Sequence, residues 1–460
     1  MRKRKYIGDR HFYRMVLTVA VPIMIQNGIT NFVGLLDNIM VGQVGTAQMS
    51  GVAIANNLIF VYNICVFGMI SGAGIFGAQF FGKGDHEGVR NTFRFKLVVC
   101  SLFLLAAVWI FFCAGGKLFS LYLQGEGAAS DIAATFRYGK EYLNIMLLGF
   151  VPFTLVQIYS GTLRDCGETF VPMLAGVLAV FVNLLFNYIL IFGHFGAPCL
   201  GVAGAAWATV LSRFVECIVT AVWTHCHPKR APFIVGAYRS FKIPRGLCRQ
   251  IVRKGTPLMA NEALWSCGMA VLLQCYSFRG LDVVASQNIS STVSNVFNVV
   301  FLALGSSVAI IVGQLLGAGR MEEAVDQDRK LIFFSVAVCF GIGAAMALMA
   351  PLFPRIYNTT ESVRSLAASF IIVEALFMPA NAFMHASYFT LRSGGRTVVT
   401  FFFDSVYVWV FSIPAAYLLG HFTAVPIVPL YVTVKCLDFI KCAIGAVLLK
   451  KRVWVQNIVG

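Results

Sequence analysis

The chain has 460 residues, of which 58% are hydrophobic and 12% are charged, and its formal net charge is +16. These values exclude an ordinary soluble domain, in which about a quarter of the residues are charged. In a soluble protein the positive charge would indicate nucleic acid. Here the basic residues lie between long apolar runs, so we expect a membrane protein with the lipid bilayer, and not nucleic acid, as its surroundings.

The thirteen cysteines lie mostly inside the apolar runs, their number is odd, and no Cys-x-x-Cys pair occurs. This pattern predicts neither a disulfide framework nor a zinc ribbon. His225, Cys226 and His227 are adjacent, and three neighbouring side chains do not readily point at one metal ion. The basic N-terminus before an apolar run resembles a signal peptide. Because the run is too long and lacks a small-x-small cleavage site, we expect an anchor helix.

The first apolar run, residues 15–42, carries Pro22 and one carboxylate, Asp37. An ionisable residue in a spanning helix is costly in lipid and normally faces a cavity or a partner, so Asp37 is a candidate for ion or substrate handling. An alternative stays open. A straight helix that begins after Arg14 places Asp37 about 34 Å along its axis, slightly beyond a hydrocarbon core, where it would be an interfacial aspartate.

Hydropathy predicts further apolar segments of spanning length after the first, and twelve in all. Their approximate limits are 15–40, 51–81, 95–115, 137–161, 169–192, 201–224, 250–278, 283–316, 331–353, 364–391, 397–420 and 427–449.

The basic residues predict the orientation of these spans. With the N-terminus inside, 27 of the 36 Lys and Arg residues fall on the inner side and six on the outer side. The remaining three, Arg213, Lys435 and Lys441, lie within spans. By the positive-inside rule we expect both termini in the cytoplasm, a location in the plasma membrane, and residues 225–254 as a basic linker on the inner face.

The two halves of the sequence repeat. Residues 77–84, GAQFFGKG, match residues 312–319, VGQLLGAG, and residues 21–24, VPIM, match residues 256–259, TPLM, both with an offset of 235. Each half contains six predicted spans, so both halves enter the membrane from the same side. This is the pattern of a parallel repeat, in which substrate lies between the halves near the middle of the membrane.

The predicted fold is therefore an all-α integral membrane protein. It has twelve transmembrane helices in two six-helix lobes, which are related by a parallel pseudo-two-fold repeat. We expect an N-terminal lobe at 1–224, a cytoplasmic linker at 225–249 and a C-terminal lobe at 250–460.

Two glycine motifs resemble nucleotide-binding motifs, but their position in the sequence does not support nucleotide binding. Residues 72–77 match G-x-G-x-x-G, and residues 77–84 match a P-loop except that Gly84 replaces the Ser or Thr that binds magnesium. Both motifs require a preceding strand, whereas these glycines follow a predicted membrane helix. Close packing of helices through small residues explains them. The chain also lacks G-x-S-x-G, H-E-x-x-H and kinase motifs, so no enzyme is predicted.

Several motifs together resemble one known family. They are GLLDNIMVGQVG at 34–45, the Gly-Gln-rich ends of spans two and eight, Asn183-x-x-x-Asn187 before Ile-Leu-Ile-Phe-Gly, and LGVAGAAWAT at 200–209. This combination, which extends over essentially the whole chain, resembles the multidrug and toxic compound extrusion (MATE) family. The resemblance implies a twelve-helix, two-lobed antiporter that expels organic cations or other amphipathic compounds, driven by inward movement of Na⁺ or H⁺.

The resemblance also implies an ion site. Asp37 matches the acid of the family's first helix, and Asn183, Asn187 and Thr209 match polar positions around the ion in the N-terminal lobe. One branch of the family has aspartate where this chain has Asn187, so the proton relay of that branch is not implied here. The only metal ion expected is a possible Na⁺ at Asp37, and no other cofactor is expected.

A second set of residues is predicted for substrate or a second cation. Glu262 is similar to a glutamate in the family's seventh helix, although it lies about one turn nearer to Pro257 than the family pattern, and the alternative is a buried glutamate with a polar neighbour. Asn381 aligns with an acid that one branch carries in the tenth helix. The spacing of Arg213 and Glu216 favours a structural ion pair.

The predicted function is secondary antiport by a monomer, with small organic cations or drugs as substrates. One carboxylate can hold either the coupling ion or a cationic substrate, so the two ligands compete. A flippase of lipid-linked oligosaccharide is an alternative with a similar fold, and a receptor or channel is disfavoured by the tandem halves. Because a hard cation needs several oxygens and a full charge, we expect the ion in the N-terminal lobe and Glu262 mainly at the substrate.

Overall fold

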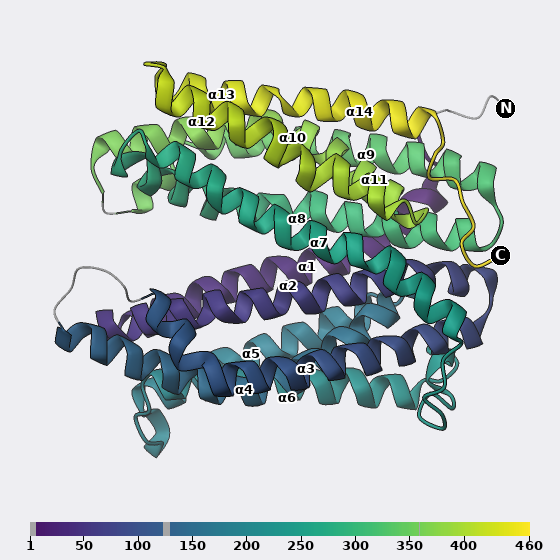
Figure 1. The fold of residues 1–460 in the computed structure, drawn as a ribbon, viewed down its shortest axis with the longest axis horizontal. Helices are drawn as coiled ribbons and strands as arrows, with labels where there is room; N and C mark the ends of the chain where they lie inside the picture. Colours follow the sequence, from purple (N-terminus) through teal and green to yellow (C-terminus); the bar gives the residue numbers. More distant parts are fainter. Residues whose placement is uncertain (1–5, 123–128, 358) are drawn as a thin grey trace. The chain divides into compact units, whose positions relative to one another are not determined.

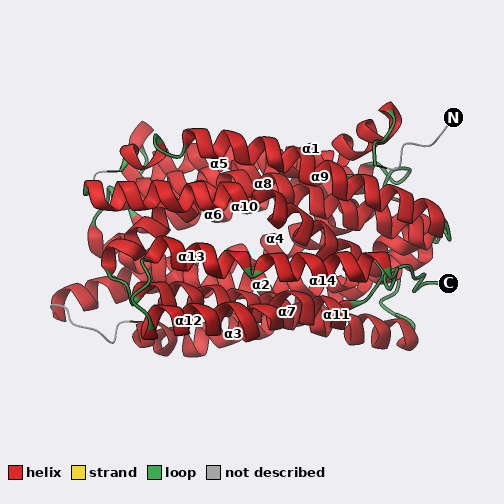
Figure 2. Ribbon diagram, turned by 90° about the horizontal axis from the view of Figure 1, so that it is seen from above, coloured by secondary structure: helices red, strands yellow, loops and turns green. Residues whose placement is uncertain are grey.

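The computed structural model describes residues 6–122, 129–357 and 359–460. Within these ranges the chain forms helices joined by turns and loops, without a strand (Figure 2). Lipid offers no hydrogen-bond partner to the backbone, so a spanning segment must satisfy its own N–H and C=O groups as an α-helix. The predicted all-α membrane fold is confirmed.

Except for α5, the helices of the first half are longer than the predicted spans because they continue past the apolar run at one or both ends. They are α1 (Arg10–Gly42), α2 (Thr46–Lys83), α3 (His86–Tyr122), α4 (Ala129–Asp165), α5 (Phe170–Phe192) and α6 (Val202–Cys226), with the short 3-10 helices η1 (His194–Gly196) and η2 (Pro232–Ile234).

The second half contains more irregular helices. They are α7 (Arg245–Ser277), α8 (Leu281–Gly317), α9 (Met321–Met349), the 3-10 helix η3 (Phe353–Ile356), α10 (Glu361–Ser393), α11 (Thr397–Phe401), the π-helical segments η4 (Phe402–Val406) and η5 (Val408–Ser412), α12 (Ile413–Phe422), α13 (Ile427–Cys436) and α14 (Asp438–Lys450).

Ten helical stretches among the described residues are long and apolar enough to cross a membrane. The segment from α11 to α12 counts as one of them, Thr397–Phe422. The two other predicted spans correspond to α7 and to α13 followed by α14. The first turns of α7 are rich in arginine and lysine, and α13 and α14 have only 10 and 13 residues each.

The chain divides into two compact units. The N-terminal unit comprises Ile25–Gly77 and His86–Gln250, and the C-terminal unit comprises Met1–Met24, Ala78–Asp85 and Ile251–Gly460. In the N-terminal unit α6 packs against α5 and α4, and α4 packs against α3 (Figure 1). In the C-terminal unit α10 packs against α8, α9 and α14. Three helices, α1, α2 and α7, therefore contribute residues to both units.

The basic linker is shorter than predicted, because α7 already begins at Arg245, directly after Pro244. Proline fixes the backbone before a helix, which explains this start. The linker also packs on the N-terminal unit. Phe233 is fully buried, and the Arg94 guanidinium on α3 donates hydrogen bonds to the carbonyls of Ala237 at 2.8 Å and Gly236 at 2.7 Å.

The repeated glycine motifs lie where α2 and α8 touch. A Cβ added to Gly82 would lie 1.9 Å from the carbonyl oxygen of Gln314, and one added to Gly317 would lie 1.9 Å from that of Gln79. Gly82 and Gln79 correspond to Gly317 and Gln314 by the offset of 235, so the contact is reciprocal. Close helix packing through small residues, predicted from the sequence, is confirmed.

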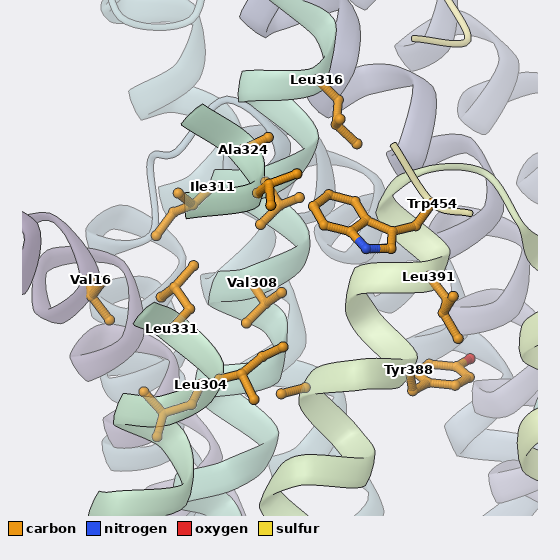
Figure 3. Packing of buried hydrophobic residues seen from close by; sticks show 14 of the residues in the cluster. Val16, Leu304, Val308, Ile311, Leu316, Ala324, Leu331, Tyr388, Leu391 and Trp454 are labelled. Atoms are coloured by element: carbon orange, nitrogen blue, oxygen red, sulfur yellow. The ribbon is translucent and has the colours of Figure 1, made fainter. Parts of the chain in front are cut away.

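The C-terminal unit has a continuous apolar core around Trp454 (Figure 3). Trp454 is 1% exposed and packs with Leu316 of α8 and Leu391 of α10, while Val16 of α1 belongs to the same cluster. The polypeptide after Trp454 is fixed by Gln79, whose side-chain oxygen accepts a hydrogen bond from the Ile458 N–H at 2.9 Å. This core holds α8 and α10 in place, and α10 carries side chains of the second candidate site.

Candidate functional site

Asp37 lies near the end of α1 and is half-buried. The side-chain amide of Asn187 on α5 donates a hydrogen bond to Asp37 Oδ1 at 2.6 Å. Asn183 and Asn187 are four residues apart on one helix, so both project from the same face. The sequence thus places two amides on the face of α5 that meets the carboxylate.

The four residues predicted for the ion site form one hydrogen-bonded chain in the N-terminal unit. Asn187 Nδ2 also donates to Asn183 Oδ1 at 3.1 Å, and Asn183 Nδ2 donates to Thr209 Oγ1 on α6 at 3.3 Å. Asn183 and Asn187 are 4% and 1% exposed. The structure therefore brings together side chains from three helices, α1, α5 and α6.

This series of hydrogen bonds leaves one buried oxygen atom without a hydrogen-bond donor. The side-chain oxygen of Asn187 has no hydrogen-bond partner among the described residues, although Asn187 Nδ2 contacts Asp37. A buried amide oxygen without a donor costs free energy unless a ligand satisfies it. A carboxylate with amide and hydroxyl oxygens nearby is a donor set that suits a hard cation such as Na⁺. The residues present fit the ion that the sequence predicts.

The arginine of α6, Arg213, already has an acidic partner. Arg213 Nη1 lies 2.9 Å from Glu216 Oε2, so the structural pair predicted from the spacing is confirmed. In the part of the chain that the structure describes, Asp37 forms no ion pair within 4.0 Å.

In the C-terminal unit Glu262 is partly buried on α7. The Tyr388 hydroxyl of α10 donates a hydrogen bond to Glu262 Oε1 at 3.3 Å. Asn381 lies seven residues before Tyr388 on the same helix and is half-buried. Among the hydrogen bonds of the described residues, none joins Asn381 to Glu262.

Sequence reasoning missed the most connected residue of this region, Asn261. Its amide nitrogen donates to Asp404 Oδ2 at 3.0 Å and to the Tyr388 hydroxyl at 3.4 Å. Asp404 Oδ1 in turn lies 2.7 Å from Lys441 Nζ on α14. A network of hydrogen bonds therefore connects Glu262 through Tyr388 and Asn261 to an ion pair within the membrane segments.

A second lysine of the last span is paired in the same way. Lys435 Nζ on α13 lies 2.7 Å from Glu374 Oε1 on α10, and the Tyr431 hydroxyl also donates to Glu374. Lys435 and Lys441 were visible in the sequence as basic residues within a predicted span. That signal indicates a buried acidic partner, because a lone ammonium is too costly in lipid.

A comparison with models of protein families shows to which family the chain belongs. The model of one family, MatE, matches residues 22–189 and 257–418, which is most of both halves. The chain belongs to the MatE family. The resemblance inferred from the motifs is thereby confirmed.

Several relatives of this MatE protein carry multidrug resistance names. The chain is 25% identical over 414 residues to a probable multidrug resistance protein NorM of Thermotoga maritima, with 88% of this chain and 85% of the relative covered. It is 24% identical over 419 residues to a probable multidrug resistance protein NorM of Bacillus subtilis, with 90% of each covered. The multidrug resistance protein MdtK of Edwardsiella ictaluri is 23% identical, with 88% and 87% covered.

Solved structures share the fold. An outward-facing multidrug resistance MATE family transporter of the MOP superfamily superposes with a TM-score of 0.86 at 20% identity, covering 98% of both chains. A MATE protein in complex with MaL6 gives a TM-score of 0.85 at 20% identity, covering 97% of this chain and 96% of the other. Because the chain belongs to the MatE family, it is a multi-pass membrane transporter, and the prediction that it is not an enzyme is confirmed by its family.

Proposed function

We propose that this MatE protein is a secondary antiporter that exports organic cations or other amphipathic compounds in exchange for inward Na⁺ or H⁺. The observation that carries the proposal is the half-buried Asp37, which accepts a hydrogen bond from the neutral amide of Asn187 and forms no ion pair with a lysine or arginine among the described residues. The relatives that carry multidrug resistance names support the substrate class. We do not favour the flippase alternative.

Asp37, Asn183, Asn187 and Thr209 would hold the coupling ion. Asp37 supplies the charge, and the unsatisfied Asn187 side-chain oxygen supplies a second ligand. The same carboxylate can bind a proton instead, or attract a cationic substrate, so occupancy by one ligand excludes the others. This competition is what couples inward ion flow to outward substrate flow.

Glu262 is assigned to substrate, and Asn381 stays a prediction for the same region. Among the described residues, the one hydrogen bond that Glu262 accepts comes from the Tyr388 hydroxyl, at 3.3 Å. Its carboxylate therefore keeps acceptor capacity for a cationic group. We also propose two lobes at 1–224 and 250–460, a monomeric transporter in the plasma membrane, and cytoplasmic termini. Labelling of residues 225–254 by an impermeant reagent applied outside intact cells would contradict this orientation.

Efflux from vesicles tests the proposal. Purified protein reconstituted in vesicles is expected to move ethidium against its gradient when a Na⁺ or an H⁺ gradient is imposed, each applied separately. Asp37→Asn is expected to abolish the coupled flux because the isosteric amide keeps its hydrogen bond but cannot change its charge. Unchanged coupling in this variant would assign Asp37 to an interfacial role.

A matched control separates the charge of Asp37 from general effects of losing a carboxylate. Glu323→Gln makes the same acid-to-amide change at an exposed ion pair with Arg320. Exposed pairs contribute about 0 to 1 kcal/mol, so this variant is expected to fold and transport as the wild type does. Loss of flux in both variants would show that the assay does not report on the Asp37 site.

A further inference from the structure

The Asp404 and Lys441 pair has the composition of a cation-recognition site. The Lys441 ammonium lies 2.7 Å from Asp404 Oδ1, 5.3 Å from the centroid of the Phe403 ring and 6.0 Å from that of Tyr407. A carboxylate together with aromatic faces is the arrangement by which proteins bind organic ammonium groups. Here the chain's own lysine occupies that position.

The carboxylate keeps its orientation without the lysine. Asp404 Oδ2 accepts a hydrogen bond from Asn261 Nδ2 at 3.0 Å, and the Asn261 side-chain oxygen accepts one from Ser405 Oγ at 2.7 Å. The Asp404 side chain is 20% exposed and that of Lys441 is 10% exposed. A group held by α7 and by its own helix stays in place when Lys441 moves, which is the preorganisation that a binding site needs.

The backbone around this pair is irregular. Asp404 lies in the π-helical segment η4, a second π-helical segment, η5, follows, and α13 gives way to α14 at Leu437. The Tyr407 hydroxyl donates a hydrogen bond to the Leu437 carbonyl at 2.6 Å and so joins the two irregular regions. π-Helical turns within longer helices are frequent at functional sites, and irregular backbone at membrane depth is tolerated where protein or a cavity surrounds it.

An apolar groove of about 330 Å³ is connected to the pair through two shared rings, because Phe403 and Tyr407 line the groove and also lie near the Lys441 ammonium. Its rim includes Phe402 and Val410, which are 59% and 55% exposed. The lining residues are Val399, Phe402, Phe403, Val406, Tyr407, Val410, Phe411, Ile444 and Leu448. The groove therefore offers an apolar surface that leads to the aromatic rings beside a carboxylate.

We propose that this region is a second binding site for an amphipathic monovalent organic cation. Its charged head takes the place of the Lys441 ammonium at Asp404, and its flat apolar body lies in the groove. The inference rests on the proposed function, because it assumes that organic cations are substrates. An acyl chain alone would fill the groove without using the carboxylate, whereas a cation with an apolar body would use both the groove and Asp404.

Lys441 is then a built-in competitor that keeps the site neutral when no substrate is bound. Its ammonium is on a flexible four-carbon stem and can leave Asp404 when a better-fitting cation arrives. A site that is occupied by an internal group most of the time binds an external ligand more weakly, in proportion to the fraction of time that it is free. Removing the ammonium must therefore raise the affinity for the cation.

Equilibrium binding of ethidium to the purified full chain in lipid nanodiscs tests the proposal, with empty nanodiscs subtracted. Lys441→Met, which keeps the length and removes the charge, is expected to bind ethidium about tenfold more tightly than the wild type. Lys441→Gln is expected to give the same direction of change and serves if the methionine variant folds poorly. The double variant Asp404→Asn with Lys441→Met, in which both charges are absent, is expected to lose the gain.

Two controls test for other causes of a gain in ethidium affinity. Lys435→Met removes the ammonium that pairs with Glu374 and is expected to change ethidium affinity less than twofold; an equal gain there would overturn the proposal as a general effect of deleting a buried lysine. Uncharged anthracene is expected to show no gain in Lys441→Met. An equal gain for anthracene would show that the groove binds apolar bodies without help from Asp404 and would also overturn it.

The outcome is separable from that of the proposed function. Wild-type efflux of ethidium under an ion gradient, together with unchanged affinity in Lys441→Met and Lys441→Gln, would reject the second site and leave the antiporter intact. Tighter binding in these variants without ion-driven efflux by the wild type would support the site and reject the antiporter.

Discussion

Asp37 and Asp404 are carboxylates of the same type in apolar helices, yet the two units satisfy them differently. Asp37 accepts a hydrogen bond from the Asn187 amide, while Asp404 pairs with the Lys441 ammonium at 2.7 Å. Glu374 in the C-terminal unit is likewise paired, with Lys435. A carboxylate with neutral partners can take up an external ion, whereas one with its own lysine is already neutralised.

We propose that the contrast reflects different roles for these two carboxylates. Asp37 in the N-terminal unit holds the coupling ion, and Asp404 in the C-terminal unit is held in an internal pair that an organic cation displaces. Both carboxylates belong to a helical scaffold in which Gly82 and Gly317, related by the offset of 235, make reciprocal close contacts within the C-terminal unit. Four experiments would break or sharpen this contrast.

The largest expected effect is on stability in the C-terminal unit. Asp404→Asn removes the partner of Lys441 and is expected to lower the free energy of unfolding by roughly 3 to 5 kcal/mol, as measured by denaturant titration in detergent. Asp404→Asn combined with Lys441→Met is expected to recover most of this loss, because no unpaired charge remains. An Asp404→Asn variant as stable as the wild type would show that Lys441 does not need Asp404 as a partner.

A smaller loss of stability is expected from substitutions where α2 and α8 pack together. Gly82→Ala and Gly317→Ala each place a Cβ 1.9 Å from a backbone oxygen of the facing helix and are expected to cost about 1 to 3 kcal/mol of unfolding free energy. Gly34→Ala is the matched control, because no atom lies within 4 Å of its Cβ position. Unequal costs at Gly82 and Gly317 would contradict the reciprocal packing of the two halves.

The smallest expected effect concerns substrate. Glu262→Gln keeps the hydrogen bond with Tyr388 and removes one negative charge, so ethidium affinity is expected to fall about tenfold, or roughly 1.4 kcal/mol. Equilibrium binding to purified protein measures the change. The ethidium affinity of Asn381→Ala is measured in the same way. Equal losses in both variants would indicate that Asn381 contributes to the same site without a hydrogen bond to Glu262.

Much of the fold could be predicted because the physical signal is local. Each apolar run must form a helix in lipid, and both the repeat and the glycine contacts were visible in residues 77–84 and 312–319. The helix ends were harder, since α7 starts within the predicted linker, at Arg245. The π-helical turns at η4 were not predictable, because they do not change the apolar pattern of the run.

The candidate site was predictable to different degrees in the two units. Asn183 and Asn187 share a helix face by their spacing, and the family resemblance added Asp37 and Thr209. The pair of Asp404 and Lys441 was missed because it joins two helices whose contact depends on tertiary structure. The presence of a lysine within an apolar run was the one local signal for it.

The most direct test of the central claim is ion-dependent stability of the purified protein. Na⁺ and, separately, pH are titrated while unfolding is followed for the wild type, Asp37→Asn and Glu262→Gln. At an ion concentration about 100 times its dissociation constant, the wild type is expected to gain about 2.7 kcal/mol of unfolding free energy. We predict that Asp37→Asn loses this gain and that Glu262→Gln retains it. Loss of the ion response in Glu262→Gln alone would place the coupling ion in the C-terminal unit and contradict the account.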